Sequence, residues 1–278
     1  MHTQHFTHLC KQAGEIAIDV LAIKSSLPKQ RLKDAMIKGA VWLKRGKHSK
    51  RLRRATTELL AGDELSLHYN AEILARIPPT PALIAHKKHY SVWHKPPGLL
   101  AQGTLEGDHC ALLRLAEQQL QREVYLVHRL DREAEGLMLI AHTGKAAAAL
   151  SALFAREGKE GIHKFYEIEV RGKASDSGEI TAMLDEKPAL TRYRLLEYRK
   201  DSDSSVVEVE LITGRKHQIR RHFAGIGHGV LGDPQYGTNN KDPRGMQLRA
   251  TRLEFLCPLS HKARTYSLTQ PEPAASDD

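Results

Sequence analysis

Alternating apolar and polar residues in the second half of the chain constrain its fold more than any other feature. In FYEIEVRG (165–172) the apolar residues share one face of an extended strand and acidic residues share the other. SSVVEVELITG (204–214) alternates in the same way, and the apolar run at 137–140 has the length of a buried strand. Because such strands outnumber the helical segments and short turns join many of them, we expect an α+β fold. Its sheet should be mixed, largely antiparallel and flanked by helices.

The chain divides into parts of different composition. Residues 1–70 hold 13 Lys and Arg against 6 Asp and Glu, so they supply +7 of the formal net charge of +9. A Pro-rich stretch, ARIPPTPA, follows them, and the final QPEPAASDD has the composition of a disordered end. We therefore expect a small basic domain at 1–74, a linker at 75–89, a second domain at 90–269 and a disordered tail at 270–278.

The small domain is expected to contain a short helix at 26–39. SLPKQRLKDAMIKG (26–39) has proline in its first turn and glycine at its end, as helices commonly do. AVWLKRGKHS and LLAGDELSLHY are typical of strands, with turns at Gly46 and at Gly62-Asp63. This order, with RLKDAMIKGAV, a basic turn and GDEL, resembles the small RNA-binding domain shared by a ribosomal small-subunit protein and tyrosyl-tRNA synthetases.

A run of seven basic residues lies in this domain and is the candidate RNA-binding segment: Lys44, Arg45, Lys47, Lys50, Arg51, Arg53 and Arg54. Such a run can be simply a solvated face. Because it belongs to a basic module joined to a nearly neutral remainder, it favours a polyanionic partner, nucleic acid above all. A membrane surface is a poorer match, since no large apolar face lies beside the run.

Several classes of protein are disfavoured by composition. No window approaches the ~20 consecutive apolar residues of a membrane span, and MHTQHFTHLC lacks the features of a signal peptide. Three scattered cysteines without a C-x-x-C pair argue against a disulfide framework or a zinc site. We expect a cytoplasmic monomer with no membrane partner and no metal.

An Arg and an Asp stand directly before the buried apolar run, in VHRLDREAEGLMLIA (127–141). A charge there is costly unless it is paired, so Arg129 and Asp131 belong either to a structural ion pair or to a site of chemistry. HKPPG (94–98) and TGRKHQIRRH leading into GHGVLGDPQYG (213–237) likewise set charged residues and His beside Gly-rich turns. We expect the three loops to converge on one polar cleft.

These segments resemble the motifs of the RluA-type RNA pseudouridine synthases over about residues 90–268. HKPPGLLA is similar to that family's N-K-P-x-G, and VHRLDREAEGLML to its signature H-R-L-D-x-x-T-S-G-L-L-L. TGRKHQIRRH and GHGVLGDPQYG are similar to its T-G-R-x-H-Q-I-R-x-H and G-H-P-I-L-G-D-x-x-Y-G, and KFYEIEVRG and ALTRY to two further strands. The resemblance implies an isomerase that converts uridine to pseudouridine in RNA without a cofactor. The two-part architecture slightly favours ribosomal over transfer RNA as the substrate.

The resemblance also implies a role for each matched residue. Asp131 is the catalytic carboxylate, and Arg129 takes the place of the uridine that leaves the RNA stack. Tyr166 packs against the flipped base and helps with proton transfer, while Arg220 forms an ion pair with Asp131. His128, in the same signature, is expected among the substrate-binding residues. Three steps stay open for Asp131: attack on the ribose, attack on the base, or removal of a sugar proton.

Three positions depart from the family pattern: His94 in place of Asn, Ala134-Glu135 in place of Thr-Ser, and Gly229 in place of Pro. Glu135 adds a negative charge close to Asp131, which would disfavour the charged carboxylate or disturb the approach of RNA. The departures leave two alternatives open. One is an inactive RNA-binding protein or RNA chaperone on the same fold, and the other is a glycosidase that releases free uracil. The retained catalytic set favours the synthase, because binding alone needs no buried nucleophile.

Overall fold

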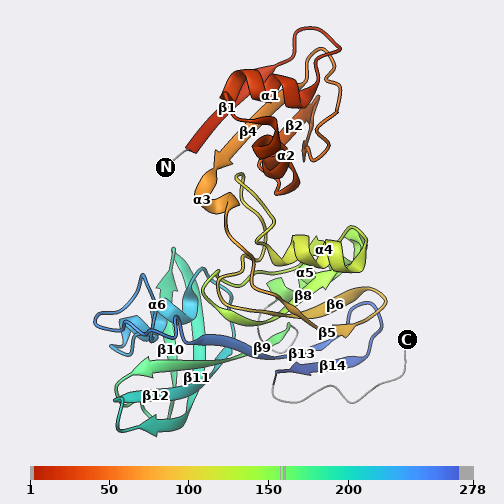
Figure 1. Cartoon of the computed structure of the whole chain (residues 1–278). Coiled ribbons are helices and arrows are strands. Elements are labelled where there is room, and N and C mark those ends of the chain that lie inside the picture. The colour runs from red at the N-terminus through yellow and green to blue at the C-terminus, as the bar shows by residue number, and fades with distance from the viewer. Residues whose placement is uncertain (1–2, 157, 159–160, 269–278) are drawn as a thin grey trace. The chain divides into compact units, whose positions relative to one another are not determined.

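The computed structural model describes residues 3–156, 158 and 161–268, and it divides into two compact units (Figure 1). Unit 1 comprises Met1–Pro78 and Gln102–Leu115, and unit 2 comprises Pro79–Ala101 and Ala116–Asp278. The chain therefore leaves unit 1, returns to it for a short segment and leaves it again. The tail expected at 270–278 lies outside the described residues. In the described part of the chain, no helix is long and apolar enough to cross a membrane.

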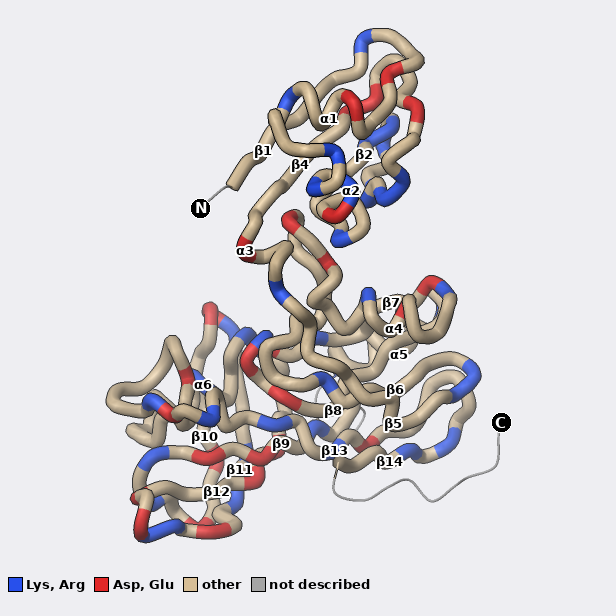
Figure 2. Tube along the Cα trace, viewed as in Figure 1, with Lys and Arg blue, Asp and Glu red and all other residues tan. Residues whose placement is uncertain are grey.

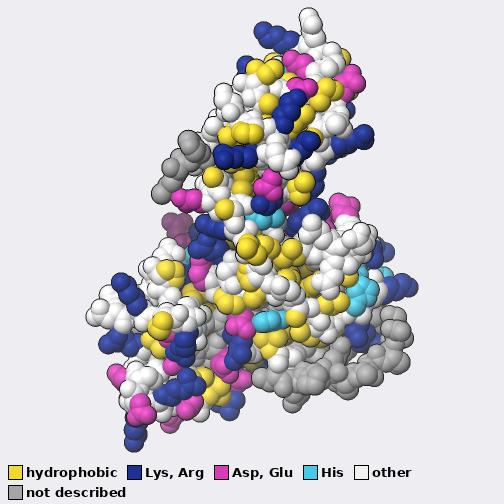
Figure 3. Space-filling view, viewed as in Figure 1, with side chains coloured by type: hydrophobic (Ala, Val, Ile, Leu, Met, Phe, Trp, Pro, Cys, Tyr) yellow, Lys and Arg dark blue, Asp and Glu magenta, His cyan; other side chains and the backbone are white. Residues whose placement is uncertain are grey.

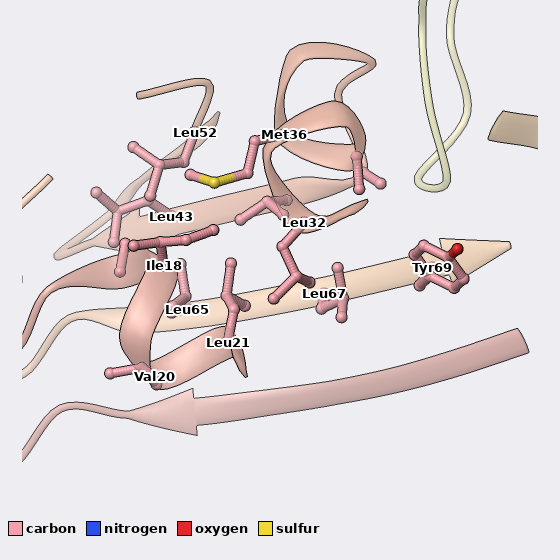
Figure 4. Close-up of a cluster of buried hydrophobic side chains, with 14 of the residues drawn as sticks. Ile18, Val20, Leu21, Leu32, Met36, Leu43, Leu52, Leu65, Leu67 and Tyr69 are labelled. Carbon is pink, nitrogen blue, oxygen red and sulfur yellow. The ribbon is translucent and has the colours of Figure 1, made fainter. Parts of the chain in front are cut away.

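Unit 1 is an antiparallel four-stranded sheet with helices packed on one face. The strand order is β1-β4-β2-β3. The strands are β1 (Thr3–Leu9), β2 (Val41–Arg45), β3 (His48–Arg51) and β4 (Glu64–Asn70), and the helices are α1 (Ala17–Ser25), α2 (Lys29–Ile37) and α3 (Ala71–Leu74). Apolar side chains of α1 and α2 meet those of β4 in a fully buried core, which includes Leu21, Leu32, Met36, Leu65 and Leu67 (Figure 4).

The helix expected within 26–39 is α2, but the sequence analysis missed α1. Its sequence, AIDVLAIKS, is apolar at most positions and holds several β-branched residues, so it has no distinct polar and apolar faces. Tertiary packing buries only part of α1, including Ile18 and Leu21, and leaves Ile23 exposed. The helix ends at Ser26, whose left-handed backbone (φ 57°) turns the chain toward α2.

Unit 2 is built on a ten-stranded sheet in the order β10-β11-β12-β9-β13-β8-β6-β5, with β14 paired to β13 and β7 to β8. Its strands are β5 (Ala82–His86), β6 (Tyr90–Lys95), β7 (Tyr125–Leu126), β8 (Glu135–Ala141), β9 (His163–Arg171), β10 (Ser177–Leu184), β11 (Lys187–Arg199), β12 (Ser204–Leu211), β13 (Leu248–Leu256) and β14 (Ala263–Ser267). The remaining helices are α4 (Leu112–Leu120), α5 (Gly144–Ala155) and α6 (Gln218–Gly225). β8 and β13 are parallel and the other named pairs are antiparallel, which confirms the expected α+β class.

β8 is the buried strand that follows the HRLD segment. Its apolar residues, among them Leu137 and Leu139, pack with Leu150 and Leu153 of α5. Gly136 has a φ of +133°, and a Cβ added there would lie 2.4 Å from the backbone N and O of Ala250 on β13. Only glycine fits this close approach. The pairing of β8 with β13 therefore fixes where the preceding loop, which carries Asp131, leaves the sheet.

Candidate active site

A pocket of about 530 Å³ opens beside the HRLD loop in unit 2. This volume lies within the ~300–1,000 Å³ typical of ligand pockets. Most of its lining comes from three places: the HRLD loop (128–134), β9, and the segment that runs from the end of β12 into α6 (211–220). Phe154 of α5 and Leu248 of β13 complete it. Two of the three loops expected to converge therefore meet here. HKPPG is not among the residues that line the pocket in the described chain.

Arg220, which is only 3% exposed, binds two carboxylates at the pocket through its guanidinium. Its Nη1 donates to Oδ2 of Asp131 at 2.8 Å, so the expected ion pair is present. Its Nε and Nη2 donate to the two carboxylate oxygens of Asp233, both at 2.7 Å. The side chain of Asp233 is fully buried, whereas that of Asp131 is 25% exposed. Arg220 therefore forms ion pairs with two carboxylates, that of buried Asp233 and that of partly exposed Asp131.

The charged form of Asp233 is strongly favoured although the group is buried. Burial by itself would raise the pKa of Asp233. Hydrogen bonds from Arg220 and from the backbone N–H groups of Gln235 and Tyr236 outweigh it and lower that pKa. The GDPQYG turn thus anchors Arg220, and Arg220 in turn anchors Asp131.

Tyr166 and His128 both line the pocket. Burial, and secondly the charge of Asp131, raises the pKa of Tyr166 well above its ordinary value, so its hydroxyl keeps its proton at neutral pH. Burial lowers the pKa of His128 to about 3, so that ring is neutral. His128 stacks on Phe154 with ring centroids 4.0 Å apart, and its Nε2 accepts the backbone N–H of Leu139. His128 thus supports the wall of the pocket through packing and a backbone hydrogen bond.

The side chains that line the pocket are predominantly basic. Asp131 is the one acidic side chain among its lining residues in the described chain, against five cationic ones: Arg129, Lys164, Arg215, Lys216 and Arg220. Arg129 is exposed. A cleft lined with charges of one sign focuses the field on a ligand of the opposite sign. The pocket therefore suits a nucleotide that carries phosphate on either side.

HKPPG supports the HRLD loop from outside the pocket. The side chain of Lys95 is fully buried, and burial lowers its pKa to about 8. Its Nζ donates to the carbonyls of Pro96 and Leu99 at 3.0 and 2.8 Å, and more weakly to that of Arg132 at 3.3 Å. The backbone N–H of Gly98 also donates to the carbonyl of Arg132. This motif therefore holds the residue that follows Asp131.

The departures from the family pattern are accommodated locally. Glu135 does not line the Asp131 pocket in the described chain; it lines a second cavity of about 340 Å³. Its carboxylate accepts a hydrogen bond from Nε2 of His94 at 2.8 Å, so two of the departures pair with each other. The expectation that Glu135 disturbs the Asp131 site is not supported by this geometry. Gly229 packs against Gly237, where an added Cβ would lie 3.1 Å from the Gly237 Cα.

The seven basic residues of the run at 44–54 have different surroundings within unit 1, where Lys and Arg gather along β2 and α2 (Figure 2). Arg51 and Arg53 both bind Asp108, at 3.1 and 2.5 Å, and Arg45 makes a two-point contact with buried Asp63. Lys44 pairs with Glu64 at 2.8 Å. Lys47, Lys50 and Arg54 are exposed and have no ion pair with another described residue. The visible face of unit 1 mixes basic, acidic and apolar side chains (Figure 3).

Sequence reasoning did not single out four residues that the structure brings to the site: Lys95, His217, Asp233 and Tyr236. All four stand inside the quoted motifs, so the motifs held the signal. His217 and Tyr236 lie beside Asp131 and Arg220, respectively, and Asp233 shares the guanidinium of Arg220. In the hydrogen-bond network around Arg220, paired residues are between 13 and 89 positions apart in the chain. The spacing of motifs in the sequence does not reveal contacts over such separations.

Comparisons with known proteins agree with this geometry. Residues 89–225 match the family model described as RNA pseudouridylate synthase. The human protein RNA pseudouridylate synthase domain containing 1 has the same fold, with a TM-score of 0.58 at 21% identity over 70% of this chain and 87% of that one. The chain therefore belongs to the RNA pseudouridine synthases.

Curated relatives place it in the RluA family of these enzymes. Ribosomal large subunit pseudouridine synthase D of Zymomonas mobilis is 33% identical over 53% of this chain and 53% of its own length. tRNA pseudouridine synthase C of Pectobacterium carotovorum is 30% identical over 66% and 57%. Dual-specificity RNA pseudouridine synthase RluA of Vibrio parahaemolyticus is 29% identical over 66% and 80%. The chain spans little more than half the length of the first two.

We predict that Arg220→Ala lowers the free energy of unfolding at pH 7 by about 3–5 kcal/mol, because it leaves Asp233 buried without its cation. The matched control is Arg221→Ala in the same helix, which removes only a pair with Asp185, itself 65% exposed, and should cost less than about 1 kcal/mol. Denaturant titrations of both variants measure the difference. Equal losses in the two variants would contradict the assigned role of Arg220.

The loss caused by Arg220→Ala should depend on pH. Since the pKa of Asp233 is lowered in the folded protein, its stabilising contribution is present above the unfolded value, about 3.9, and disappears as pH falls through the folded value. A protonated Asp233 needs no cation. The difference in the free energy of unfolding between wild type and Arg220→Ala should therefore become smaller as the pH falls below about 3.9.

Proposed function

We propose that this protein is a cytoplasmic RNA pseudouridine synthase that isomerises uridine in a structured RNA. The observation that carries the proposal is the pairing of Asp131 with Arg220 in a basic pocket, within a chain of this family. The reaction breaks the bond between N1 of uracil and the ribose, turns the base and rejoins it through C5. C5 loses a proton and N1 gains one, so substrate and product are isomers.

Asp131 is the proposed catalytic carboxylate. Its Oδ2 is bound to Arg220 and its side chain is partly exposed to the pocket, so one oxygen is stabilised while the other can meet the substrate. A neighbouring cation favours the ionised form that a nucleophile or a stabiliser of positive charge on the sugar requires. Arg220 therefore positions the carboxylate and supplies the cation next to it.

Arg129, Tyr166 and His128 are proposed to receive the nucleotide. The target atoms are inaccessible in a base stack, so the uridine must flip out into the pocket. Arg129 is exposed at the pocket and would fill the vacated place in the RNA. Tyr166 lies in the wall with its hydroxyl protonated, where it can pack against the flipped base and take part in proton transfer. His128 shapes the same wall.

We expect Asp131→Asn to abolish pseudouridine formation, by at least ~10³-fold, while RNA affinity stays nearly unchanged. Asn has almost the same shape but can neither attack nor carry the charge. Nucleoside digests of RNA incubated with each protein would be analysed for pseudouridine and free uracil. Pseudouridine made by the variant would contradict the role of Asp131. Free uracil from the wild type would favour a glycosidase, and RNA binding without either product would favour the inactive alternative.

Ribosomal RNA is the substrate we propose. A catalytic region joined to a separate basic unit suits a large, folded RNA that must be held away from the reacting uridine. One relative is named for the ribosomal large subunit and another for tRNA, so the names alone support either class. Pseudouridine maps of RNA from cells with and without the gene should differ at a site in ribosomal RNA. A difference confined to tRNA would overturn this choice.

We also propose that unit 1 supplies phosphate contacts. Three of its exposed cations have no ion pair to a described residue and are the best placed: Lys47, Lys50 and Arg54. Arg51, Arg53 and Arg45 are held by carboxylates of the same unit, so they contribute less to binding and more to its structure. The basic run therefore combines structural and RNA-binding residues.

Replacing Lys47, Lys50 and Arg54 together by Gln should flatten the slope of log K against log salt by about 2 units, since each phosphate contact contributes about −0.7 on single strands. The rate at saturating RNA should change little, because the pocket is untouched. A matched control replaces three exposed lysines of unit 2 by Gln: Lys88, Lys145 and Lys200. An equal flattening in the control, or none in either protein, would contradict the proposed RNA-binding role of this segment.

A further inference from the structure

The two oxygens of Asp131 have different surroundings. Oδ2 accepts a hydrogen bond from Arg220 at 2.8 Å. Oδ1 is not held in this way; Nε2 of His217 faces it at 3.6 Å, too far for a hydrogen bond. His217 lines the same pocket. Oδ1 is therefore the oxygen left for the substrate, and an imidazole nitrogen stands within reach of it.

The ring of His217 is itself held in place. Its Nδ1 lies 3.1 Å from the hydroxyl of Tyr236, and the two rings meet edge to face at 5.6 Å. If the Tyr236 hydroxyl donates to Nδ1, the proton of the neutral ring is on Nε2 and points at Asp131. The other tautomer would direct a lone pair at the carboxylate, which is electrostatically unfavourable. The hydrogen-bond partner of Nδ1 thus determines whether Nε2 carries a proton.

The backbone of His217 has a conformation that few residues other than glycine adopt. It has φ 52° and ψ 30° at the start of α6, in the left-handed region. Such a residue costs free energy and persists where its surroundings impose it, often at functional sites. The turn needed to start α6 here holds His217 against Asp131 instead of letting it follow the helix away from the pocket.

Burial, more than the charges around it, leaves the ring of His217 neutral at physiological pH by lowering its pKa. Burial is the main cause that lowers its pKa, and Arg220 and Lys216 lower it further. Asp131 and Asp233 oppose them, but the net shift is downward. An uncharged N–H donor can approach the carboxylate without competing with Arg220 as a second full cation.

We propose that His217 is a positioning residue for the reaction, directing its Nε2–H at Oδ1 of Asp131 and closing onto that oxygen when a uridine nucleotide enters the pocket. Long contacts of this kind in a free enzyme commonly shorten in the substrate complex. Tyr236 serves by fixing the tautomer of His217, and its ring also lies beneath the guanidinium of Arg220, 5.1 Å from it. The inference rests on the synthase activity proposed above and adds to it the group that orients the reactive oxygen.

Two substitutions of His217 separate this role from packing. Asn tolerates the left-handed backbone and can still reach Tyr236, but it is too short to reach Asp131; Gln places its amide nitrogen where Nε2 was. We expect His217→Asn to lower kcat by about 10- to 100-fold with KM within about twofold, and His217→Gln to restore most of the loss. A merely structural histidine would not be rescued by Gln in this way.

The chain offers a matched control for the backbone. His261 is also left-handed, with φ 55°, and its side chain is exposed. His261→Asn therefore makes the same chemical change on the same kind of backbone, and kcat and melting temperature should stay at wild-type values. If His217→Asn behaves like His261→Asn, the positioning role is wrong.

A spectroscopic measurement tests the same inference without activity. In ¹⁵N NMR of the whole protein, the His217 ring should be neutral with its proton on Nε2 at pH 7. Tyr236→Phe, which keeps the ring but removes the hydroxyl, should shift part of the population to the other tautomer and lower kcat through His217. A proton found on Nδ1 in the wild type would overturn the proposal.

The outcomes distinguish this inference from the proposed function. If the wild type forms pseudouridine, Asp131→Asn does not, and His217→Asn keeps the wild-type kcat, the synthase assignment stands and the role of His217 falls. If the wild type forms no pseudouridine in any RNA tested, the proposed function fails and this inference fails with it.

Discussion

The guanidinium of Arg220 is the interaction on which the site depends. It is buried, and a buried cation is stable only when its donors are satisfied by acceptors of opposite charge. Asp233 satisfies two of them from the GDPQYG turn and Asp131 a third from the HRLD loop. Two segments, one 13 and the other 89 residues away from Arg220 in the chain, are thereby held around one planar group. The fork geometry of Arg makes this possible, and the point charge of Lys could not reproduce it.

The sheet of unit 2 delivers these segments to one place. The parallel pairing of β8 with β13 requires Gly136, since any side chain there would collide with Ala250. With β8 fixed, the loop before it leaves the sheet at a set position, and Lys95 and Gly98 hold the carbonyl of Arg132 from the other side. The HRLD loop is thus restrained at its sheet end and at the carboxylate of Asp131. Such restraint keeps reacting groups within the small tolerances that catalysis requires.

Charge along the sequence and charge available for binding differ in unit 1. The run at 44–54 contributes strongly to the net charge, yet Arg45, Arg51 and Arg53 bind Asp63 and Asp108 within the unit. Asp108 lies in Gln102–Leu115, the short segment by which the chain returns to unit 1. A carboxylate more than 50 residues away in sequence thus converts two of the basic residues into structural ones. Counting basic residues overstates the number that can contact a polyanion.

Local patterns were sufficient for the fold class, for strands such as β4, β8, β9 and β12 and for the residues of the motifs, because alternation and short-range turn chemistry depend on neighbours in sequence. They did not reveal β1, β10, β13 or β14. They were also insufficient for α1, a helix without a distinct polar face, and for the direction in which the Glu135 side chain points. That side chain is next to the HRLD loop in sequence but pairs with His94 from β6. The sequence by itself determined which residue types are present for the chemistry. Only the tertiary structure decided that Asp233 and His217 share the site with Asp131. The physical reason is that ion pairs around a buried cation depend on distance in space and not on distance along the chain.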